Sequence, residues 1–372
     1  MNSFKIAVSH LYDGTAILAD KVLTIDNGVI MKVDDAGSHE NIKQGLLIPG
    51  FIDIQVNGGG GYLFNQQPSV DSIKKIADAH AQFGTTGWLP TLVTDSFERM
   101  QAAADAVAQS IVIEPSVLGI HFEGPFLSVN KKGVHSEQHI RELSDKDIQL
   151  MSRQDLGKVL VTIAPENVSP TQISELVSEG IIVSIGHSAA TYSQTLDALQ
   201  AGATGFTHLY NAMSGLSSRE PGVVGAALTT KNTYSGIILD GIHLHPAAAK
   251  VAFGSETELM LVTDAMPPVG TTDTDFEFFG QAIKRQGNQL TDSNGRLAGS
   301  TLDMLNAVKN AERMLAIDFH KAVDLATINP AKFLGLDQRM AKLAEGFEAD
   351  MLFLDEQQNI VASWVKGKQI LD

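Results

Sequence analysis

The sequence predicts an α/β protein whose main domain is a (β/α)8 barrel of the TIM type. Three observations lead to this fold class: eight short apolar runs recur between about residues 47 and 336, helix-like stretches separate most of them, and the runs are apolar on both faces. The length of 372 residues exceeds that of a usual single domain, but such barrels often run past about 250 residues. Apolar residues make up 44% and charged residues 19% of the chain, so a large core can be buried.

The two ends of the chain differ from the middle. The first 48 residues contain short β-like runs broken by turn residues, such as FKIAVSHLYDG and TAILADKVLTIDNG. The last 30 residues repeat this pattern with ADMLFLDEQQN and IVASWVKGKQI. We therefore expect residues 1–48 and 337–372 to form one small β-sandwich domain, and residues 49–336 to form the barrel.

The expected barrel strands are, in order, FIDIQVN, TGWLPTLV, SVLGIHFEG, VLVTIAPE, IIVSIGHS, TGFTHLYN, SGIILDG and LMLVTDA. Segments between them, such as SVDSIKKIADAHAQFG and TYSQTLDALQAG, open with Ser or Thr and close at Gly, as capped helices do. After the eighth run, a stretch near residues 271–296 looks like a β-hairpin insertion, and the helix-like TLDMLNAVKNAERMLAI follows it.

Composition and charge narrow the class of function. The net charge of −16 argues against a nucleic-acid partner, because phosphate binding requires a clustered basic surface. No run approaches the roughly 20 apolar residues that span a bilayer, and the start MNSFKIAVSH lacks the pattern of a signal peptide. With no cysteine there are no disulfides and no thiolate ligands. We expect a cytoplasmic protein without a membrane partner, in which any pocket for a small anion is built from a few local Arg, Lys or His residues.

Polar residues follow several of the apolar runs, at the strand ends where the active sites of such barrels form. Four of them can bind a metal or move a proton, namely Glu123, His187, His208 and Asp264. Each by itself is more often a cap or a hydrogen-bonded strand end, but four on one rim favour a site. One carboxylate and two imidazoles suit a catalytic Zn²⁺ or Fe²⁺ that keeps a position open for water. Such a metal lowers the pKa of its water toward ~7, and Asp264 is placed to act as the general base.

The first and fourth runs favour one metal over two. Gln55 and Asn57 have the spacing at which a His-x-His pair would create a second site, but amides are weak ligands for zinc. We treat these two residues as candidate vestigial positions of a second metal. The fourth run, VLVTIAP, does not end in a lysine that could bridge two metals as a carbamate. The sequence therefore predicts one divalent metal per subunit, with Zn²⁺ first and Fe²⁺ second.

A set of longer motifs carries a family resemblance. The segments LIPGFIDIQVNG, HFEGPFL, KKGVH, GHSAAT, THLYNAMSGLSSREPGVVGA, DGIHLHP, LVTDAMPP and LAGS resemble, in this order, the N-acetylglucosamine-6-phosphate deacetylases of the amidohydrolase superfamily. The resemblance covers essentially the whole chain. It implies hydrolysis of the acetamide of the sugar phosphate to acetate and glucosamine 6-phosphate, in amino-sugar catabolism, with a water activated by the metal as the nucleophile.

The resemblance also implies roles for individual residues. Glu123, His187 and His208 would hold the metal, Asp264 would be the general base and then the acid, and His135 would polarise the acetamide carbonyl. The implied substrate contacts are Val134, His135, Asn211, Ala212, Arg219, Asp240, His243, Leu297, Ala298 and Gly299. In this family the arginine that matches Arg219 reaches in from the neighbouring subunit, which implies a homodimer. With His243, it would supply the local positive charge that an acidic protein needs.

Three alternatives stay open. The first is a closely related deacetylase acting on N-acetylgalactosamine 6-phosphate, which differs at one hydroxyl. The second is a serine hydrolase, because Ser188 lies in a G-x-S-x-A turn close to the nucleophile elbow, although the last glycine of that motif is missing. The third is a barrel that only binds or assembles, which no feature of the sequence favours, because all the expected ligands and the base are present.

Overall fold

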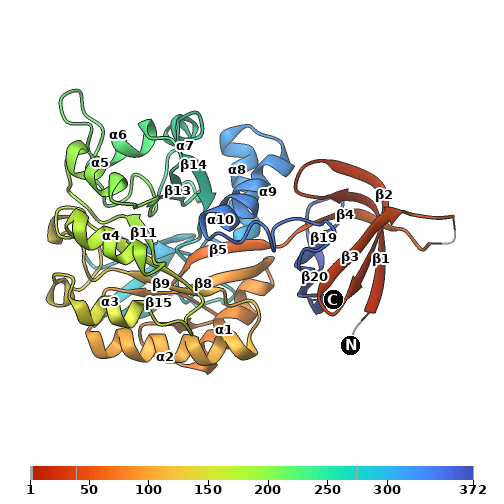
Figure 1. Ribbon diagram of the computed structural model, residues 1–372, viewed down its shortest axis with the longest axis horizontal. Coiled ribbons are helices and arrows are strands. Elements are labelled where there is room, and N and C mark those ends of the chain that lie inside the picture. Colours follow the sequence, from red (N-terminus) through yellow and green to blue (C-terminus); the bar gives the residue numbers. More distant parts are fainter. Residues whose placement is uncertain (1–2, 39, 274, 372) are drawn as a thin grey trace.

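The computed structural model describes residues 3–38, 40–273 and 275–371, and consists of a barrel with a smaller β domain beside it (Figure 1). The barrel is one parallel sheet whose strand order follows the chain. Its strands are β5 (Phe51–Val56), β8 (Thr85–Val93), β9 (Gly119–Glu123), β10 (Lys158–Ile163), β11 (Ile182–Ile185), β12 (Gly205–Phe206), β13 (Tyr234–Ile237) and β14 (Glu258–Leu261). Each of the eight expected runs overlaps one of these strands, so the predicted barrel is confirmed.

Hydrogen bonds beyond the ends of the first and last strands close the barrel. The backbone N–H of Asp264 donates to the backbone carbonyl of Gln55 over 3.0 Å, and the backbone N–H of Asn57 donates to the backbone carbonyl of Ala265 over 3.0 Å. A parallel bridge between Val56 and Ala265 lies between these two bonds. The residues that seal the sheet are therefore those of the expected site.

Helices connect the strands and cover the outside of the sheet. They are α1 (Val70–Ala81), α2 (Phe97–Ile113), α3 (Asp145–Met151), α4 (Pro170–Ser178), α5 (Tyr192–Gln200), α6 (Gly222–Thr229), α7 (Pro246–Phe253), α8 (Met304–Leu315), α9 (Phe319–Ala326) and α10 (Ile328–Phe333). The Ser69 side chain caps α1 by accepting from the Ser72 amide, and Thr191 with Gln194 forms a capping box on α5. Both helices start where their sequence signals predict. Within the described ranges, no helix is long and apolar enough to cross a membrane.

The barrel interior is apolar at its wall and polar along one line. The wall packs large buried side chains such as Trp88, Phe122 and Phe206. The His121 Nε2 atom lies 2.8 Å from the Thr162 hydroxyl, which lies 2.7 Å from the Thr207 hydroxyl. His121 is therefore a satisfied interior residue beneath the strand ends, and burial lowers its pKa to about 4, so that it is neutral.

The two ends of the chain combine in the small domain, as the fold class predicts. Its strands form one seven-stranded sheet in the order β21-β20-β19-β4-β1-β2-β3, so that red and blue segments lie side by side in Figure 1. They are β1 (Ser3–Tyr12), β2 (Ile17–Asp26), β3 (Val29–Asp35), β4 (Lys43–Pro49), β19 (Met351–Leu354), β20 (Ile360–Val365) and β21 (Lys368–Leu371). A separate apolar core that includes Leu23, Phe353 and Trp364 packs between them.

The insertion after the eighth barrel strand is larger than a hairpin. It is an antiparallel sheet of β15 (Asp275–Phe278), β16 (Gln281–Gln286), β17 (Gln289–Thr291) and β18 (Leu297–Ser300). The last strand returns to the barrel, because Ser300 forms a bridge with Ala265. The short apolar LAGS stretch therefore belongs to the insertion and still lies beside the barrel rim. A short pair, β6 (Gly58–Gly59) and β7 (Tyr62–Leu63), follows the first strand.

Candidate active site

Three of the expected site residues follow their strands with an unusual backbone. His187, His208 and Asp264 have φ values of 47°, 36° and 51°, in the left-handed region that residues with a Cβ rarely adopt. Such conformations cost roughly 1–3 kcal/mol each and are found mainly at functional sites. Ala212, four residues after His208, has a φ of 51° as well. The chain thus stores backbone strain at the rim where the sequence predicts a metal and a base.

Glu123, His187 and His208 converge on one point. The Glu123 Oε1 atom lies 3.2 Å from His187 Nε2 and 3.0 Å from His208 Nε2, and the two nitrogens lie 3.0 Å apart. All three side chains are buried. Tetrahedral zinc with bonds of about 2.0–2.1 Å places its ligand atoms about 3.3 Å apart, close to this spacing.

The hydrogen bonds behind this group show that it fits a cation. The His187 Nδ1 atom lies 2.8 Å from the Lys131 carbonyl. Because a carbonyl only accepts, Nδ1 carries the proton, and in a neutral ring Nε2 presents a lone pair to Glu123. A lone pair facing a carboxylate oxygen is repulsive unless a cation lies between them. The donor set therefore matches a divalent metal held by one carboxylate and two neutral imidazoles.

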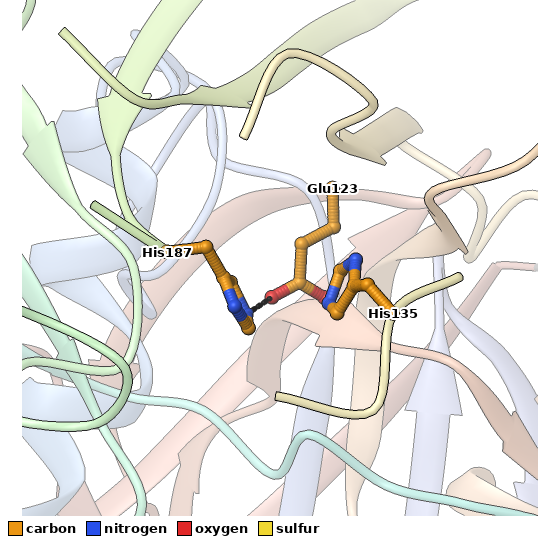
Figure 2. Close-up of side chains that lie close together, drawn as sticks. All are labelled: Glu123, His135 and His187. Atoms are coloured by element: carbon orange, nitrogen blue, oxygen red, sulfur yellow. Dashed lines mark hydrogen bonds and ion pairs between the residues drawn. The ribbon is translucent and has the colours of Figure 1, made fainter. Parts of the chain in front are cut away.

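His135 lies beside the same carboxylate. Figure 2 shows the Glu123 carboxylate between the imidazoles of His187 and His135, and one ligand atom from each of these three residues lies within 4.8 Å of the others. The His135 Nδ1 atom is 2.9 Å from the Thr94 hydroxyl. The geometry thus offers two sets of three ligands that share Glu123 and His187. The set with His208 is the tighter one, because its three ligand atoms lie 3.0–3.2 Å from one another.

The charges of the site depend on one another. Burial alone would raise the pKa of Glu123, but the adjoining imidazoles of His187 and His208 outweigh it and hold that pKa well below its usual range. Burial opposes the charged form of His208, but its bond to Glu123 raises its pKa overall. Burial, and then the neighbouring His187, lower the pKa of His135 well below its usual range. His135 is therefore a neutral ring that can donate one hydrogen bond.

Two amides hold the carboxylate of Asp264. The Asn57 Nδ2 atom donates to Asp264 Oδ1 over 2.6 Å, and the Gln55 Nε2 atom lies 3.3 Å from the same oxygen. Gln55 also donates to Glu123 Oε1 over 3.1 Å, so that it links the two carboxylates. Burial, followed by repulsion from Glu123, raises the pKa of Asp264 to about 6. A carboxylate with such a pKa can both accept and return a proton near neutral pH.

A cavity of about 420 Å³ opens onto this group. Its volume suits a small ligand. Twelve of the residues predicted from the sequence line this cavity: Asn57, Glu123, Val134, His135, His187, His208, Asn211, Ala212, His243, Asp264, Leu297 and Gly299.

Four predicted residues lie outside the lining of this cavity. Gln55 lies behind the two carboxylates. Asp240 accepts from His243 Nδ1 over 2.6 Å and from the His243 amide, so that it orients His243. Ala298 is fully buried between two lining residues of β18. Arg219 lies in an exposed loop and is not among the described residues that line the cavity.

The cavity also contains residues that the sequence did not single out. Lys131 and Arg296 bring positive charge to its wall, and Ile238, Met266 and Phe278 add apolar surface. Two signals were present in the sequence, because Lys131 opens the KKGVH motif and Arg296 directly precedes LAGS. Phe278 comes from the insertion, whose position over the rim no local pattern indicates.

Ser188 is not arranged as a nucleophile. Its hydroxyl donates to the Glu166 carboxylate over 2.7 Å and accepts from the Ala190 amide over 3.0 Å. A serine nucleophile needs a base that accepts its proton while the oxygen stays open to the substrate. Here the oxygen is fully buried and holds the turn that follows His187.

Comparisons with known proteins agree with this geometry. The model of the amidohydrolase family matches residues 46–370. The chain is 51% identical over 333 residues to the N-acetylgalactosamine-6-phosphate deacetylase of Shewanella sp. (strain ANA-3), covering 89% of this chain and 84% of that protein. It is 32% identical to the N-acetylglucosamine-6-phosphate deacetylase of Haemophilus influenzae, covering 96% of this chain and 97% of that protein.

Solved structures agree as well. The crystal structure of N-acetylglucosamine-6-phosphate deacetylase from Pasteurella multocida superimposes with a TM-score of 0.94 at 33% identity, covering 99% of this chain and 100% of that chain. The same enzyme from Thermotoga maritima superimposes with a TM-score of 0.91 at 29% identity, with 99% of each chain covered. The likeness thus extends over both the barrel and the small β domain.

Proposed function

The chain belongs to the amidohydrolase family, and from that premise we propose that it removes the acetyl group of an N-acetylated amino-sugar 6-phosphate and releases acetate. The observation that carries this proposal is the convergence of Glu123, His187 and His208 beside the half-buried Asp264, on the wall of one small cavity. This arrangement joins a metal set, a proton carrier and a space for a small substrate.

N-acetylglucosamine 6-phosphate is the substrate that we propose first. The relative from Haemophilus influenzae and the structure from Pasteurella multocida both bear that name. N-acetylgalactosamine 6-phosphate is the second candidate, because the relative at 51% identity bears the name of the galactosamine enzyme. The two sugars differ at one hydroxyl, so a single contact on the cavity wall is enough to separate them.

One divalent metal per subunit is part of the proposal, with Zn²⁺ first and Fe²⁺ second. Glu123, His187 and His208 would hold it, in keeping with the lone pair that His187 directs at Glu123. A metal bound there supplies Lewis-acid chemistry, which lowers the pKa of water and polarises a carbonyl. The Gln55 and Asn57 amides point their donors at carboxylates, which supports a single site and their treatment as vestigial positions of a second one.

Asp264 moves the proton in this proposal. It accepts a proton from the attacking water and delivers it to the departing nitrogen of the amide, so that the amine leaves as a neutral group. Its Oδ1 atom is fixed by Asn57 and Gln55, so the carboxylate keeps one orientation through both transfers.

His135 donates to the acetamide oxygen as negative charge develops there. Its ring is neutral, lies beside Glu123 and is held by the Thr94 hydroxyl. One such donor contributes about 3–4 kcal/mol to the stabilisation of the transition state. The ring stands 4.2 Å from that of His187, between centroids, and therefore contacts a substrate that reaches the metal set.

The sugar phosphate occupies the rest of the cavity. Asn211 and the Ala212 backbone contact the sugar phosphate, and Leu297 with Gly299 contacts the opposite side. His243, which Asp240 orients, contacts the phosphate or a hydroxyl. Arg219 reaches the phosphate of the neighbouring subunit in a homodimer, which its position on an exposed loop allows. A cytoplasmic location completes the proposal, supported by the absence of cysteine.

An acetate-release assay tests this function. The protein, reconstituted in turn with Zn²⁺ and Fe²⁺, is given each of the two epimers, and the expected result is metal-dependent acetate release that a chelator abolishes. Absence of acetate from both epimers would overturn the proposal. Activity that survives the chelator and is lost on Ser188→Ala would support a serine hydrolase instead.

A further inference from the structure

Arg296 lies at the rim of the active-site cavity on the insertion. It directly precedes β18, whose residues Leu297 and Gly299 line the same cavity. His243 and Asn211 line it as well. The Arg296 side chain is 45% exposed and Arg296 lines the cavity, so that this side chain is accessible to a ligand.

The charges of the cavity call for a cation from this chain. Glu123 and Asp264 are carboxylates on its wall, and the protein as a whole carries a net charge of −16. A phosphate monoester adds close to two negative charges. Among the described residues that line the cavity, Lys131 and Arg296 are the ones that bring an ammonium or a guanidinium group. A guanidinium suits phosphate better, because it binds two oxygens at once.

Asp292 holds the Arg296 guanidinium in place. The Arg296 Nε atom donates to Asp292 Oδ2 over 2.8 Å, and Nη2 lies 2.8 Å from the same oxygen. The other oxygen, Oδ1, accepts from the amides of Asn294 and Arg296, and the Asp292 side chain is fully buried. The carboxylate is thus fixed by the turn. The Nε–H group bonds to it and Nη2 forms the ion pair, so that the N–H groups on the far side of the guanidinium remain for a ligand.

We propose that Arg296, oriented by Asp292, binds the phosphate group of the substrate within its own subunit. This inference rests on the proposed function, because it assigns a contact to the sugar phosphate named there. It adds a second guanidinium to the one proposed from the neighbouring subunit. Because Arg296 is carried by the insertion and not by the barrel, it selects the substrate without contacting the reacting atoms.

The test compares Arg296→Gln with Arg285→Gln. Arg285 lies on β16 of the same insertion, bonds to the Gly287 carbonyl through Nε and is not among the described residues lining this cavity, so its loss matches the change of charge. We expect Arg296→Gln to raise KM for the phosphorylated sugar about 10-fold with kcat within about twofold, as loss of ground-state binding does. Arg285→Gln leaves both constants unchanged.

Further variants separate a contact from a structural role. Arg296→Lys keeps the positive charge but not the planar guanidinium that can bind two phosphate oxygens at once, and we expect a rise in KM of about threefold. Asp292→Asn frees the guanidinium, and its KM falls between those of the wild type and Arg296→Gln. The kcat/KM for the sugar without phosphate stays unchanged in Arg296→Gln. An equal loss for both sugars, or an unchanged KM for the phosphorylated one, would overturn the inference.

A binding measurement keeps this inference distinct from the proposed function. Calorimetry with glucosamine 6-phosphate, on the metal-loaded wild type and on Arg296→Gln, requires no turnover. A wild type that binds this ligand about 10-fold more tightly than the variant, but releases no acetate from either epimer, would support the contact and refute the deacetylase. If the wild type releases acetate but binds glucosamine 6-phosphate no more tightly than Arg296→Gln, the deacetylase is supported and the Arg296 contact is refuted.

Discussion

The side-chain amide of Asn57 donates to Asp264 Oδ1 over 2.6 Å. This bond joins the end of the first barrel strand, β5, to the segment that follows the last barrel strand, β14. The Asn57 Oδ1 atom is buried without a hydrogen-bond partner in the part of the chain that the structure describes. This amide therefore has no competing bond that would pull it away from the carboxylate.

We expect Asn57→Ala to lower kcat by about 10-fold, because a lost hydrogen bond to a charged group costs about 1.5–3 kcal/mol and frees the Asp264 carboxylate to rotate. Steady-state kinetics on the preferred epimer gives the value, and metal content is measured beside it. Metal content should stay at the wild-type level, because Asn57 faces the base. Loss of the metal in Asn57→Ala would show instead that this residue is a ligand.

His208 and His135 compete for the third position of the metal set, and metal analysis separates them. We expect His208→Ala to lose the bound metal, because its Nε2 atom is 3.0 Å from both other ligand atoms. We expect His135→Ala to keep the metal and lose about 10²–10³-fold in kcat, as removal of one oxyanion donor does. Elemental analysis after dialysis gives the comparison. A His135→Ala protein without metal would reassign the third ligand.

Arg219 and Asp264 test the shared site when each is changed in a separate protein. Mixing Arg219→Ala with Asp264→Asn, each nearly inactive, should restore activity to about a quarter of the wild-type level, because half of randomly assorted dimers are hybrids with one complete site. The activity is measured before and after exchange of subunits. If Arg219 served its own subunit, no hybrid would contain a complete site and mixing would restore nothing.

Asp350 makes stability depend on pH far from the active site. It is buried in the small domain, and burial raises its pKa to about 7, although its Oδ1 atom accepts from the Lys366 amide over 2.7 Å. A raised folded-state pKa means that the stability this group provides is complete below the unfolded-state pKa of about 3.9 and is lost as pH rises through 7.

Asp350→Asn should therefore stabilise the protein increasingly as pH rises from 4 to 7, by up to roughly 4 kcal/mol above pH 7. The asparagine oxygen can still accept from the Lys366 amide, so the hydrogen bond is kept. Thermal unfolding of both proteins at pH 5 and pH 8 measures the difference, with Glu356→Gln, on the exposed turn after β19, as the control. A stability difference between Asp350→Asn and the wild type that narrows as pH rises would contradict the raised pKa of Asp350.

The sequence was sufficient for the barrel because its strands are covered on both faces. Runs such as SVLGIHFEG and LMLVTDA are nearly continuous in apolar residues, and their polar ends mark the rim directly. The convergence of Glu123, His187 and His208 could be predicted from strand ends alone, since each of them lies at the end of such a run. The additional ligand atom of His135 could not be, because this residue lies on a loop whose path depends on tertiary contacts.

Contacts between distant segments explain what the sequence missed. The stretch near residues 271–296 was expected as a hairpin, whereas the insertion has four strands and includes LAGS. The bridge from Ser300 to Ala265 and the bond from the Ser300 hydroxyl to the Thr263 carbonyl bring that last strand back to the barrel, and with it Arg296. Asp240 was expected to contact the substrate, whereas its carboxylate bonds to His243 and to two backbone amides. Such pairings have no signature in local periodicity.

The bonds that close the barrel have a consequence for how activity arises during synthesis. The backbone of Asp264 completes the ring by donating to Gln55, while its side chain receives the amides of Gln55 and Asn57. A nascent chain in which the last strand has not reached the first has neither a continuous ring nor an oriented base. Hydrolysis therefore begins only when more than two hundred residues of intervening chain have folded. An incompletely folded copy has no activity, and not merely a reduced one.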